Sequence, residues 1–303
     1  MKKKTGLILA AALALCSTAA MAAQNEDAAL EEGYTEEKDD CTSVVSWCKN
    51  GDMNIYGRFY YPEDFDESQT YPTIIMSHGL ASTSTLVERA NWPLRAAAEG
   101  FVVYTFDFCG GSINSNSDGE YLEMSVMTEV SDLNAVMDFV EDQPYVDTDR
   151  LFLLGQSQGG LVSALTAAQR NEEVKGLCLV YPALCIVDDL HEYIPDIQEV
   201  TGDTVETALG QLGAIYATDM YDVDVYSEIA AYQGPVLIIH GEEDMTVPLS
   251  ASEKAMEVSY ADNDASLLVI SGEKSKHGFE MIDETLRDQA EDAGMEFFTG
   301  LIG

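Results

Sequence analysis

The chain has 303 residues, enough for one large domain with a buried core, and 46% of them are hydrophobic. Its 54 acidic residues against 15 lysines and arginines give a formal net charge of -39. Such a charge repels nucleic acid, anionic membranes and phosphorylated substrates. We therefore expect no nucleic-acid partner and no stable membrane association, and the charge disfavours a thioesterase that acts on coenzyme A esters.

The first residues are typical of a secretory signal peptide. Three lysines precede a short apolar run, and the run ends in small residues that suit cleavage. We expect residues 1–23 to be removed by cleavage near Ala22 or Ala23, and the mature protein to be exported to the periplasm or the medium. The apolar run is too short for a membrane span, and Leu15 before Cys16 disfavours lipoprotein processing.

Two short segments lead into the main domain, which we expect to span residues 43–303. Residues 24–42 are acidic and aperiodic, which predicts a disordered or loosely docked arm. Residues 43–61 alternate apolar and polar side chains around Asn50 and Gly51. This pattern is typical of an antiparallel hairpin at the start of a sheet.

Removal of the signal peptide leaves an odd number of cysteines, which in an exported protein implies at least one free thiol. Cys41 and Cys48 flank a short segment near the N-terminus, and a local disulfide between them is one pairing that the sequence allows. Cys109, Cys178 and Cys185 lie in or beside apolar strand segments, so we expect them to be buried.

After the hairpin, apolar strand segments alternate with helical segments. Strands are predicted near residues 73–78, 101–107, 151–156, 177–182, 235–240 and 266–271. Helices are predicted near residues 84–99, 125–142, 158–170, 250–260 and 279–298. This alternation indicates an α/β fold, with a mostly parallel sheet and helices on both of its faces.

The segment LFLLGQSQGG, residues 151–160, places Ser157 at the end of an apolar strand. A turn from strand to helix at this serine forces a strained backbone, and Gly155 and Gly159 leave room for it. This is the GxSxG nucleophile-elbow pattern, which exposes the hydroxyl above the sheet at a helix N-terminus. An isolated GxSxG also occurs in structural turns, so its partner residues decide its meaning.

Two partners follow the fifth and sixth of the predicted strands. Asp244 lies in the loop HGEEDMTVP, and His277 lies in the loop SGEKSKHGF. Open α/β sheets bind ligands at the carboxyl ends of their strands, where all three residues are expected. The order serine, aspartate, histidine is that of the α/β-hydrolases. Glu242 and Glu243 compete with Asp244 for the acid role, and the distance past the strand favours Asp244.

These residues suggest specific roles in acyl transfer. His277 is the candidate base for the Ser157 hydroxyl, and Asp244 would orient the imidazole and stabilise its protonated form. The backbone N–H groups of Leu80 and Gln158 are candidate donors of an oxyanion hole. This chemistry requires no cofactor and no metal, and we expect neither.

Three further histidines have simpler interpretations. His78 and His240 each follow a strand in a His-Gly turn, where a structural role is favoured over proton transfer. His191 lies beside several carboxylates, but no second histidine lies at helical spacing from it. A metal site at His191 is therefore disfavoured.

Residues 184–232 form an insertion far longer than the usual connection of about 2 to 6 residues, and we expect a cap over the active site. No lysine or arginine occurs between Lys175 and Lys254, so this cap disfavours anionic substrates. Tyrosines can grip planar or sugar-like groups, although they can equally anchor the cap to the core. The candidate substrate contacts are Tyr193, Tyr216, Tyr221 and Tyr226.

Several segments resemble one branch of the α/β-hydrolase superfamily, the bacterial cinnamoyl or feruloyl esterases. These are MSHGLAS, FDFCGGS, SDGEYLEMSVMTEVSDLNAVMDFV, GQSQGG, HGEEDMTVPLSASEK and HGF, within about residues 50–300. The resemblance implies serine-dependent hydrolysis of carboxylic esters. It also implies Ser157, Asp244 and His277 as the triad, with Leu80 and Gln158 as the backbone donors.

The chain departs from that branch at three places. Gln156 replaces the histidine that more often precedes the nucleophile. The segment FDFCGGSINSNSDG lacks the family's histidine and is longer. The loop from Gly272 to His277 is also longer and carries Lys274 and Lys276. All three places border the predicted pocket, so substrate preference need not follow the family.

The leading hypothesis is an exported serine carboxylesterase that acts on a small-molecule ester, of hydroxycinnamoyl, other aryl or short-acyl type. A serine peptidase shares the elbow and the residue order, and we expect it less because peptidases of this fold usually carry a propeller or similar accessory domain. The third hypothesis, from another class, is a non-catalytic binding module on the same fold. The presence of all three triad residues disfavours it.

Overall fold

The computed structural model describes residues 30–38, 41–207 and 209–303. The predicted signal peptide therefore lies outside the described residues. The strands are β1 (Thr35–Lys38), β2 (Cys41–Asn50), β3 (Met53–Tyr61), β4 (Tyr71–Ser77), β5 (Val102–Phe106), β6 (Val146–Gln156), β7 (Val174–Val180), β8 (Thr204–Thr207), β9 (Gly210–Gly213), β10 (Val236–Gly241) and β11 (Ala265–Ile270).

The helices alternate with these strands, as the sequence predicts. They are α2 (Ser84–Arg89), α3 (Trp92–Ala98), η3 (Tyr121–Glu123), α4 (Val126–Glu141), α5 (Gln158–Gln169), α6 (Ile186–Tyr193), η4 (Ile197–Glu199), α7 (Ala214–Met220), α8 (Val225–Ile229), α9 (Leu249–Val258), α10 (Phe279–Ile282) and α11 (Glu284–Ile302). Among the described residues, no helix is long and apolar enough to cross a membrane.

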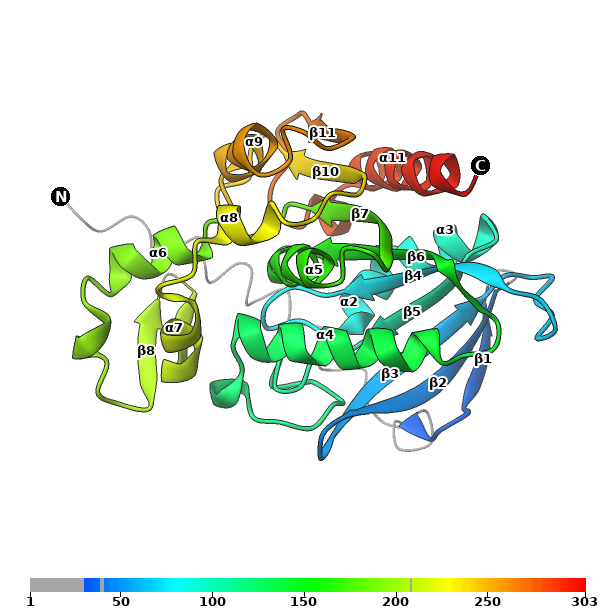
Figure 1. Cartoon of the computed structure of the whole chain (residues 1–303), viewed down its shortest axis with the longest axis horizontal. Helices are drawn as coiled ribbons and strands as arrows, with labels where there is room; N and C mark the ends of the chain where they lie inside the picture. The colour runs from blue at the N-terminus through cyan, green and yellow to red at the C-terminus, as the bar shows by residue number, and fades with distance from the viewer. Residues whose placement is uncertain (1–29, 39–40, 208) are drawn as a thin grey trace.

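The central sheet has nine strands in the order β1-β2-β3-β5-β4-β6-β7-β10-β11. In this order, each neighbouring pair from β5 onwards (β5-β4, β4-β6, β6-β7, β7-β10 and β10-β11) is parallel. The pairs β1-β2, β2-β3 and β3-β5 are antiparallel. Helices cover both faces (Figure 1). The predicted fold class is confirmed: a mostly parallel α/β sheet with helices on both sides.

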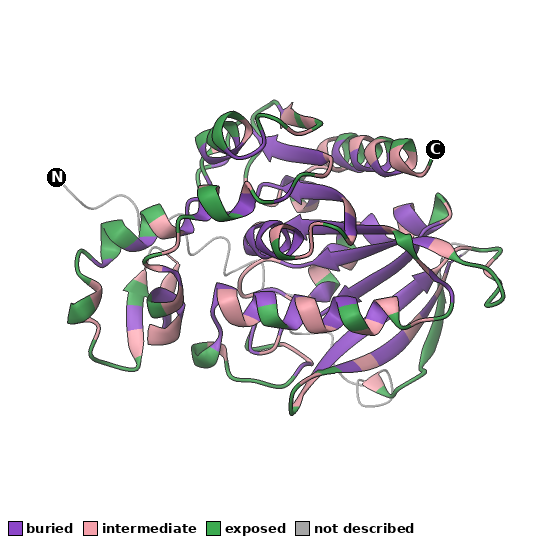
Figure 2. Ribbon diagram, in the orientation of Figure 1, coloured by how far each residue is buried: buried purple, intermediate pink, exposed green. Residues whose placement is uncertain are grey.

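Each face of the sheet has its own hydrophobic core, because successive side chains of a strand point to opposite faces. Ile75 and Leu153 contribute to the core under α4 and α5, whereas Ile74 and Phe152 contribute to the core under α3 and α11. Figure 2 shows the central strands buried along almost their whole length. This double burial explains why these strands are nearly continuous apolar runs in the sequence.

The predicted hairpin is confirmed, but its turn lies one residue later than expected. Asn50 pairs with Met53, so Gly51 and Asp52 form the two-residue loop. Gly51 has φ 58°, a conformation that glycine adopts without steric cost. A glycine at the first loop position suits a type II′ turn, which matches the twist of the two strands.

The arm expected to be disordered or loosely docked contains β1, so this expectation is wrong for residues 30–38. β1 pairs antiparallel with β2, and the indole N–H of Trp47 donates to the carbonyl of Leu30 at 3.0 Å. The backbone N–H of Trp47 also donates to the Glu32 carboxylate at 2.9 Å. The arm thus covers a sheet edge that would otherwise expose unpaired backbone groups.

The suggested disulfide between Cys41 and Cys48 is contradicted, because both thiols are free. The two residues lie at opposite ends of β2, about 23 Å apart at about 3.3 Å per residue. Their odd spacing also sends them to opposite faces of the sheet, into different cores. Burial raises the pKa of Cys48 to about 12, so this thiol is unreactive at neutral pH.

Two predicted helices are each divided in the structure. The segment 84–99 breaks at Asn91, which has φ 65°, and Pro93 lies in the first turn of α3, where proline is tolerated. The segment 279–298 breaks at Asp283, whose carboxylate accepts from the backbone N–H groups of Thr285 and Leu286 and so caps α11.

The long insertion lies between β7 and β10 and contains α6, η4, the two-stranded sheet β8-β9, α7 and α8. In Figure 1 its first part extends to the left of the main sheet. α7 packs against η3 and against α4. The insertion therefore reaches the main body near the start of α4, beside the carboxyl ends of the central strands.

A buried glutamate on α11 gives the stability a distinct pH dependence. Burial raises the pKa of Glu291 to about 7, and contacts with Asn91 and Arg287 only partly offset this. The folded protein therefore holds a proton that the unfolded chain releases, so the stability falls as the pH rises from the ordinary carboxyl range through about 7. We expect Glu291→Gln to reduce the fall in Tm between about pH 5 and pH 8 by a few degrees.

The matched control is Glu296→Gln, which removes the same charge from an exposed position of α11. Thermal unfolding of the two variants and the wild type at several pH values separates burial from net charge. An equal pH slope in both variants would contradict the assignment to Glu291.

Candidate active site

Ser157 lies at the sharp turn between β6 and α5. Its backbone has φ 54° and ψ −120°, a conformation that costs free energy for any non-glycine residue. The N–H of Ser157 donates to the carbonyl of Val180 at 3.0 Å. Its own carbonyl accepts from Ala183 at 2.9 Å and from Gly160 at 3.0 Å. The neighbouring strand and loop therefore hold the serine in its strained conformation.

The two glycines of the elbow are required by close backbone approach. A Cβ added to Gly155 would lie 2.3 Å from the carbonyl oxygen of Gly159. A Cβ added to Gly159 would lie 2.3 Å from the carbonyl oxygen of His78. The sequence-based explanation of these glycines is therefore confirmed by the contacts themselves.

We expect Gly159→Ala to lower the Tm by about 3 to 10 °C, because overpacking against backbone costs about 1 to 3 kcal/mol. Gly300→Ala on α11 is the matched control, since nothing lies within 4 Å of its Cβ position. Alanine there is expected to keep or slightly raise the Tm, because it is the better helix former. Equal Tm values in both variants would contradict the packing explanation.

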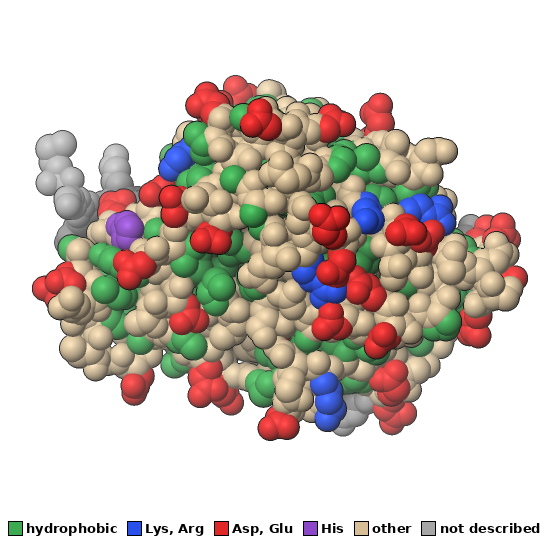
Figure 3. Space-filling view, in the orientation of Figure 1, with side chains coloured by type: hydrophobic (Ala, Val, Ile, Leu, Met, Phe, Trp, Pro, Cys, Tyr) green, Lys and Arg blue, Asp and Glu red, His purple; other side chains and the backbone are tan. Residues whose placement is uncertain are grey.

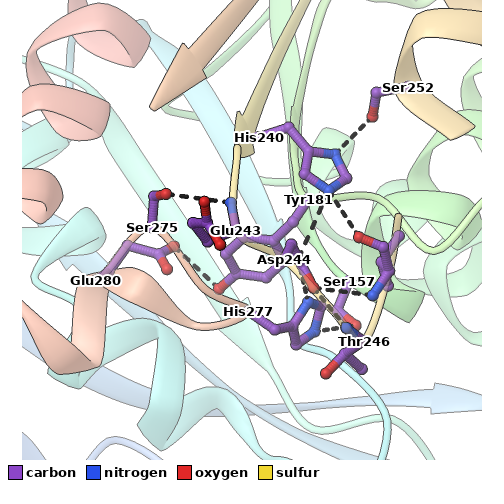
Figure 4. Close-up of polar contacts among 11 residues, drawn as sticks. Ser157, Tyr181, His240, Glu243, Asp244, Thr246, Ser252, Ser275, His277 and Glu280 are labelled. Carbon is purple, nitrogen blue, oxygen red and sulfur yellow. Dashed lines mark hydrogen bonds and ion pairs between the residues drawn. The ribbon is translucent and has the colours of Figure 1, made fainter. Parts of the chain in front are cut away.

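His277 reaches Ser157 from the loop after β11. Its Nε2 lies 3.0 Å from the Ser157 hydroxyl oxygen, and its Nδ1 lies 2.7 Å from a carboxylate oxygen of Asp244 (Figure 4). Ser275 shapes this loop, because its hydroxyl donates to the carbonyl of Gly272 at 2.6 Å. The structure thus brings the three predicted triad residues into one hydrogen-bonded line.

Asp244 is buried and held by several donors. Its Oδ1 accepts from the N–H groups of Thr246 and Val247, both at 2.9 Å. Burial alone would raise the pKa of Asp244, but the imidazoles of His240 and His277 and the N–H of Val247 outweigh it and hold the pKa well below its ordinary value. The ionised carboxylate can only accept, so it requires the proton of the neutral His277 ring on Nδ1.

That tautomer has a direct chemical consequence. With its proton on Nδ1, the neutral His277 ring presents a lone pair at Nε2 to the Ser157 hydroxyl. The arrangement can therefore remove the hydroxyl proton as the serine attacks. Glu242 and Glu243, the alternative acids, are both exposed. Neither side chain accepts a hydrogen bond from His277 in the described structure.

His78 and His240, which we interpret as structural, are both buried and hydrogen-bonded. His78 is buried; its Nδ1 donates to the carbonyl of Gly79 at 2.8 Å, and its Nε2 accepts from the N–H of Phe108 at 3.0 Å. Burial lowers the pKa of His78, consistent with this neutral ring. His240 bridges the Ser252 hydroxyl, at 2.7 Å, to the loop of Asp244, and its Nε2 lies 3.6 Å from the Asp244 carboxylate.

His191 contacts Tyr221, whose carbonyl lies 2.8 Å from its Nε2. Among the described residues, no group of three metal-ligating side chains is present. The absence of a cofactor or metal from the chemistry stays a prediction.

A buried group behind His277 was not predicted from the sequence. The Tyr181 ring packs against the His277 ring with the centroids 4.5 Å apart, and its hydroxyl donates to Glu280 at 3.0 Å. Gln156, the residue before the nucleophile, donates to the same carboxylate oxygen at 3.1 Å. Burial raises the pKa of Glu280. Figure 4 shows how Glu280 supports the tyrosine that packs against His277.

The predicted oxyanion donors lie on segments that adjoin the serine. The backbone at Gly79 passes so close that an added Cβ would lie 3.0 Å from the Ser157 Cβ. Leu80 follows directly, and Gln158 opens α5. Within the described residues, neither the N–H of Leu80 nor that of Gln158 has a backbone or side-chain acceptor. Both donors are therefore free to bind an anionic oxygen, and that role stays a prediction.

The four candidate tyrosines of the insertion lie in different environments. Tyr216 is buried, and its hydroxyl donates to the side chain of Gln158 at 2.7 Å. Tyr221 packs edge-on against His191, and Tyr226 lies under the ammonium of Lys254. Tyr193 is exposed. The structure thus brings only Tyr216 into contact with a residue of the candidate site, and the substrate-binding role of all four stays a prediction.

The sheet order, the elbow and the serine, histidine and aspartate at the carboxyl ends of β6, β11 and β10 define an α/β-hydrolase, and the chain is a serine hydrolase of that fold. The sequence profile of the prolyl oligopeptidase family matches residues 89–302. The chain therefore belongs to this family.

Curated relatives include both peptidases and proteins of undescribed activity. The prolyl endopeptidase FAP of Mus musculus is 29% identical over 125 residues, which are 40% of this chain and 16% of that protein. The dipeptidyl-peptidase 5 of Porphyromonas gingivalis is 23% identical over 70% of this chain and 31% of its own length. The chain thus spans less than a third of either relative.

Two solved structures share the fold over nearly their full length. The ferulic acid complex of Est1E from Butyrivibrio proteoclasticus superposes with a TM-score of 0.71 at 22% identity, over 83% of this chain and 98% of that one. The DcsB complex with its substrate analogue gives a TM-score of 0.68 at 20% identity, over 86% and 99%. The expected resemblance to α/β-hydrolases of the feruloyl esterase type is therefore confirmed at the level of the fold.

Proposed function

We propose that the protein is an exported carboxylester hydrolase that acts through an acyl-enzyme on Ser157. One observation carries the proposal: the Ser157 hydroxyl, the His277 ring and the Asp244 carboxylate form a continuous line with contacts of 3.0 and 2.7 Å. The serine lies at a helix N-terminus beside two unpaired backbone donors. This is the geometry that nucleophilic acyl transfer needs.

The proposed reaction has two halves. In the first, Ser157 attacks the ester carbonyl carbon while its proton passes to His277 Nε2, and the carbonyl oxygen becomes an anion held by the N–H groups of Leu80 and Gln158. The alcohol then leaves with the proton from His277. In the second half, water repeats the attack and the free acid leaves. Each oxyanion donor is worth about 3 to 4 kcal/mol in such a transition state.

The acidic surface of the protein favours neutral or cationic substrates over anionic ones. Figure 3 shows acidic side chains spread over the visible face, with few lysines and arginines among them. The insertion adds to this field, because no lysine or arginine occurs between Lys175 and Lys254. The field would also speed the departure of the carboxylate product. The likeness to Est1E with bound ferulic acid supports hydroxycinnamoyl or other aryl esters as the first class to assay.

A serine peptidase is the second candidate function, and one observation favours it. The profile of the prolyl oligopeptidase family matches residues 89–302, which include the elbow, and peptidases are among the curated relatives. Amide hydrolysis uses the same three residues, so the geometry of the triad does not separate the two activities. The leaving group that the protein accepts is therefore the property to measure.

The decisive experiment compares ester and peptide substrates with matched acyl groups. The ester series should vary acyl length, aromaticity and charge, and the peptide series should include dipeptidyl and prolyl anilides. We expect kcat/KM for neutral aryl esters to exceed that for the matched anilides by more than a hundredfold. Comparable values would favour the peptidase, and equal rates for neutral and anionic esters at low salt would contradict the role of charge.

A fluorophosphonate probe separates a catalyst from a binding module. The probe reacts only with an activated serine, and mass analysis of the labelled protein identifies the modified peptide. Absence of labelling in the folded protein would remove both catalytic proposals. Expression of the full chain, with N-terminal sequencing of the exported form, tests cleavage near Ala22 or Ala23.

A further inference from the structure

The side chain of Gln158 is buried between the main body and the insertion. Its Nε2 donates to the carboxylate of Glu129 on α4 at 2.8 Å, and its Oε1 accepts from the hydroxyl of Tyr216 on α7 at 2.7 Å. All three side chains are at most 2% exposed. One amide at the start of α5 therefore ties together three helices, and one of them belongs to the insertion.

A second contact joins α7 to the same part of the body. Asp219, three residues after Tyr216, accepts from the hydroxyl of Ser125 at 2.6 Å. Ser125 caps α4, and its hydroxyl also accepts from the N–H of Thr128. Residues three apart lie on one face of a helix. The face of α7 that carries Tyr216 and Asp219 thus packs against the first turn of α4 and the first residue of α5.

The glutamate of this network is costly for folding. Glu129 lies fully buried, its Oε1 has no hydrogen-bond partner among the described residues, and burial raises its pKa well above the ordinary value. A buried carboxyl of this kind destabilises a core that an apolar residue of similar size would fill. Its contact with Gln158 gives it a role that an apolar residue lacks, which is to fix the orientation of the amide.

We propose that Gln158 is a positioning residue of the oxyanion hole. The contact of its side chain with α7 fixes where its backbone N–H lies. The inference rests on the proposed function, because the backbone N–H of Gln158 is one of the two proposed donors. Glu129 and Tyr216 hold the side chain of this residue from opposite ends. Displacement of α7 therefore shifts the donor itself, and effective donors must lie about 2.7 to 3.1 Å from the oxyanion.

The main test is Tyr216→Phe, which removes one hydroxyl and keeps the ring. The matched control is Tyr232→Phe, because Tyr232 is equally buried and its hydroxyl donates to the carbonyl of Val174, at the opposite end of the sheet. We expect Tyr216→Phe to lower kcat about tenfold with KM within twofold, and the control to keep both within twofold.

The Ki of a transition-state analogue distinguishes positioning of the donor from a merely structural role, because a merely structural role would leave this Ki unchanged. The Ki of an aryl trifluoromethyl ketone, which forms an oxyanion on the serine, is expected to rise in parallel with the loss of kcat. The Ki of the product acid is expected to stay within twofold. A raised KM with unchanged kcat would make Tyr216 a substrate contact and overturn the proposal, and so would an unchanged ketone Ki.

Two substitutions of Glu129 test its contact with the Gln158 amide, and one of them is conservative. Glu129→Gln keeps an acceptor for the amide of Gln158, whereas Glu129→Leu removes it at similar volume. We expect the loss of kcat in Glu129→Leu to be at least about fivefold larger than in Glu129→Gln. Equal losses in the two variants would show that the amide contact does not position the donor.

Amide hydrogen exchange tests the positioning role independently of activity. In Tyr216→Phe, peptides of α7 and the peptide that begins α5 are expected to exchange faster together, whereas Tyr232→Phe leaves both unchanged. If the wild type neither hydrolyses esters nor reacts with fluorophosphonate, the proposed function fails. The positioning role fails separately if the exchange of α5 is unchanged when that of α7 rises.

Discussion

Ser157→Ala is expected to lower kcat/KM for aryl esters by about 10⁵- to 10⁶-fold, because the attacking atom is removed. Residual catalysis over water is expected, because the donors of Leu80 and Gln158 and the binding pocket remain. Fluorophosphonate labelling is expected to disappear completely. The fold should persist, because the alanine keeps the Cβ and the backbone hydrogen bonds that hold the elbow.

Ser163→Ala is the matched control for this result. Ser163 lies on α5, is fully buried, and its hydroxyl has no hydrogen-bond partner among the described residues. Its removal is expected to leave kcat/KM within about twofold. Measured hydrolysis and circular dichroism of both variants separate chemistry from folding. More than about 1% residual activity in Ser157→Ala, or labelling at another serine, would contradict the assignment of the nucleophile.

Sequence alone predicts the elbow because its constraints are local. The strand, the serine and the two glycines lie within ten residues, and the close contacts of Gly155 and Gly159 leave little choice of residue type. The placement of Asp244 and His277 follows from a general rule, since both directly follow apolar strands whose carboxyl ends meet at one edge of the sheet. Neither prediction requires knowledge of the distances within the triad.

The buried glutamates show what the sequence analysis missed. Glu129 lies among the buried positions of α4, with Val126, Val130 and Leu133, which form a helical stripe at spacings of three and four. Glu291 occupies the same kind of position on α11. A carboxylate inside an apolar stripe is a detectable signal, but it is hidden among 54 acidic residues when only net charge is considered.

The contacts around the site's buried polar groups are set by tertiary packing that no local sequence pattern contains. Gln158 and Tyr216 are 58 residues apart, and Gln156 and Glu280 are 124 apart. Their meeting depends on how the insertion and α10 dock on the sheet. The arm shows the same limit, because its pairing with β2 depends on a sheet edge and not on its own apolar content.

The second large effect concerns the acid of the triad. Asp244→Asn is expected to lower kcat about 10⁴-fold with little change in KM. The asparagine oxygen can still accept from the N–H groups of Thr246 and Val247, which leaves its amide facing His277 Nδ1. An amide N–H requires an acceptor there, so the ring proton moves to Nε2. His277 then cannot accept the proton of Ser157.

Glu243→Gln is the control that separates the two neighbouring carboxylates. Glu243 is exposed, and its contacts with Ser275 are made by its backbone N–H, which the substitution keeps. Its kcat is expected to stay within about twofold of the wild type. Steady-state kinetics on both variants decide the assignment, and a larger loss in Glu243→Gln than in Asp244→Asn would reverse it.

The dependence of stability on acid pH tests the lowered pKa of Asp244. The pKa of Asp244 is lower in the folded protein than in the unfolded chain, so its contribution to stability is present above the ordinary carboxyl pKa and is lost as the pH falls through the folded value. Asp244→Asn removes this contribution, so the variant should lose less stability than the wild type on acidification. Glu291 has the opposite effect, because its raised pKa lowers the stability as the pH rises toward about 7. We therefore expect Asp244 to affect the acid side of the plot of stability against pH, and Glu291 to affect the neutral side.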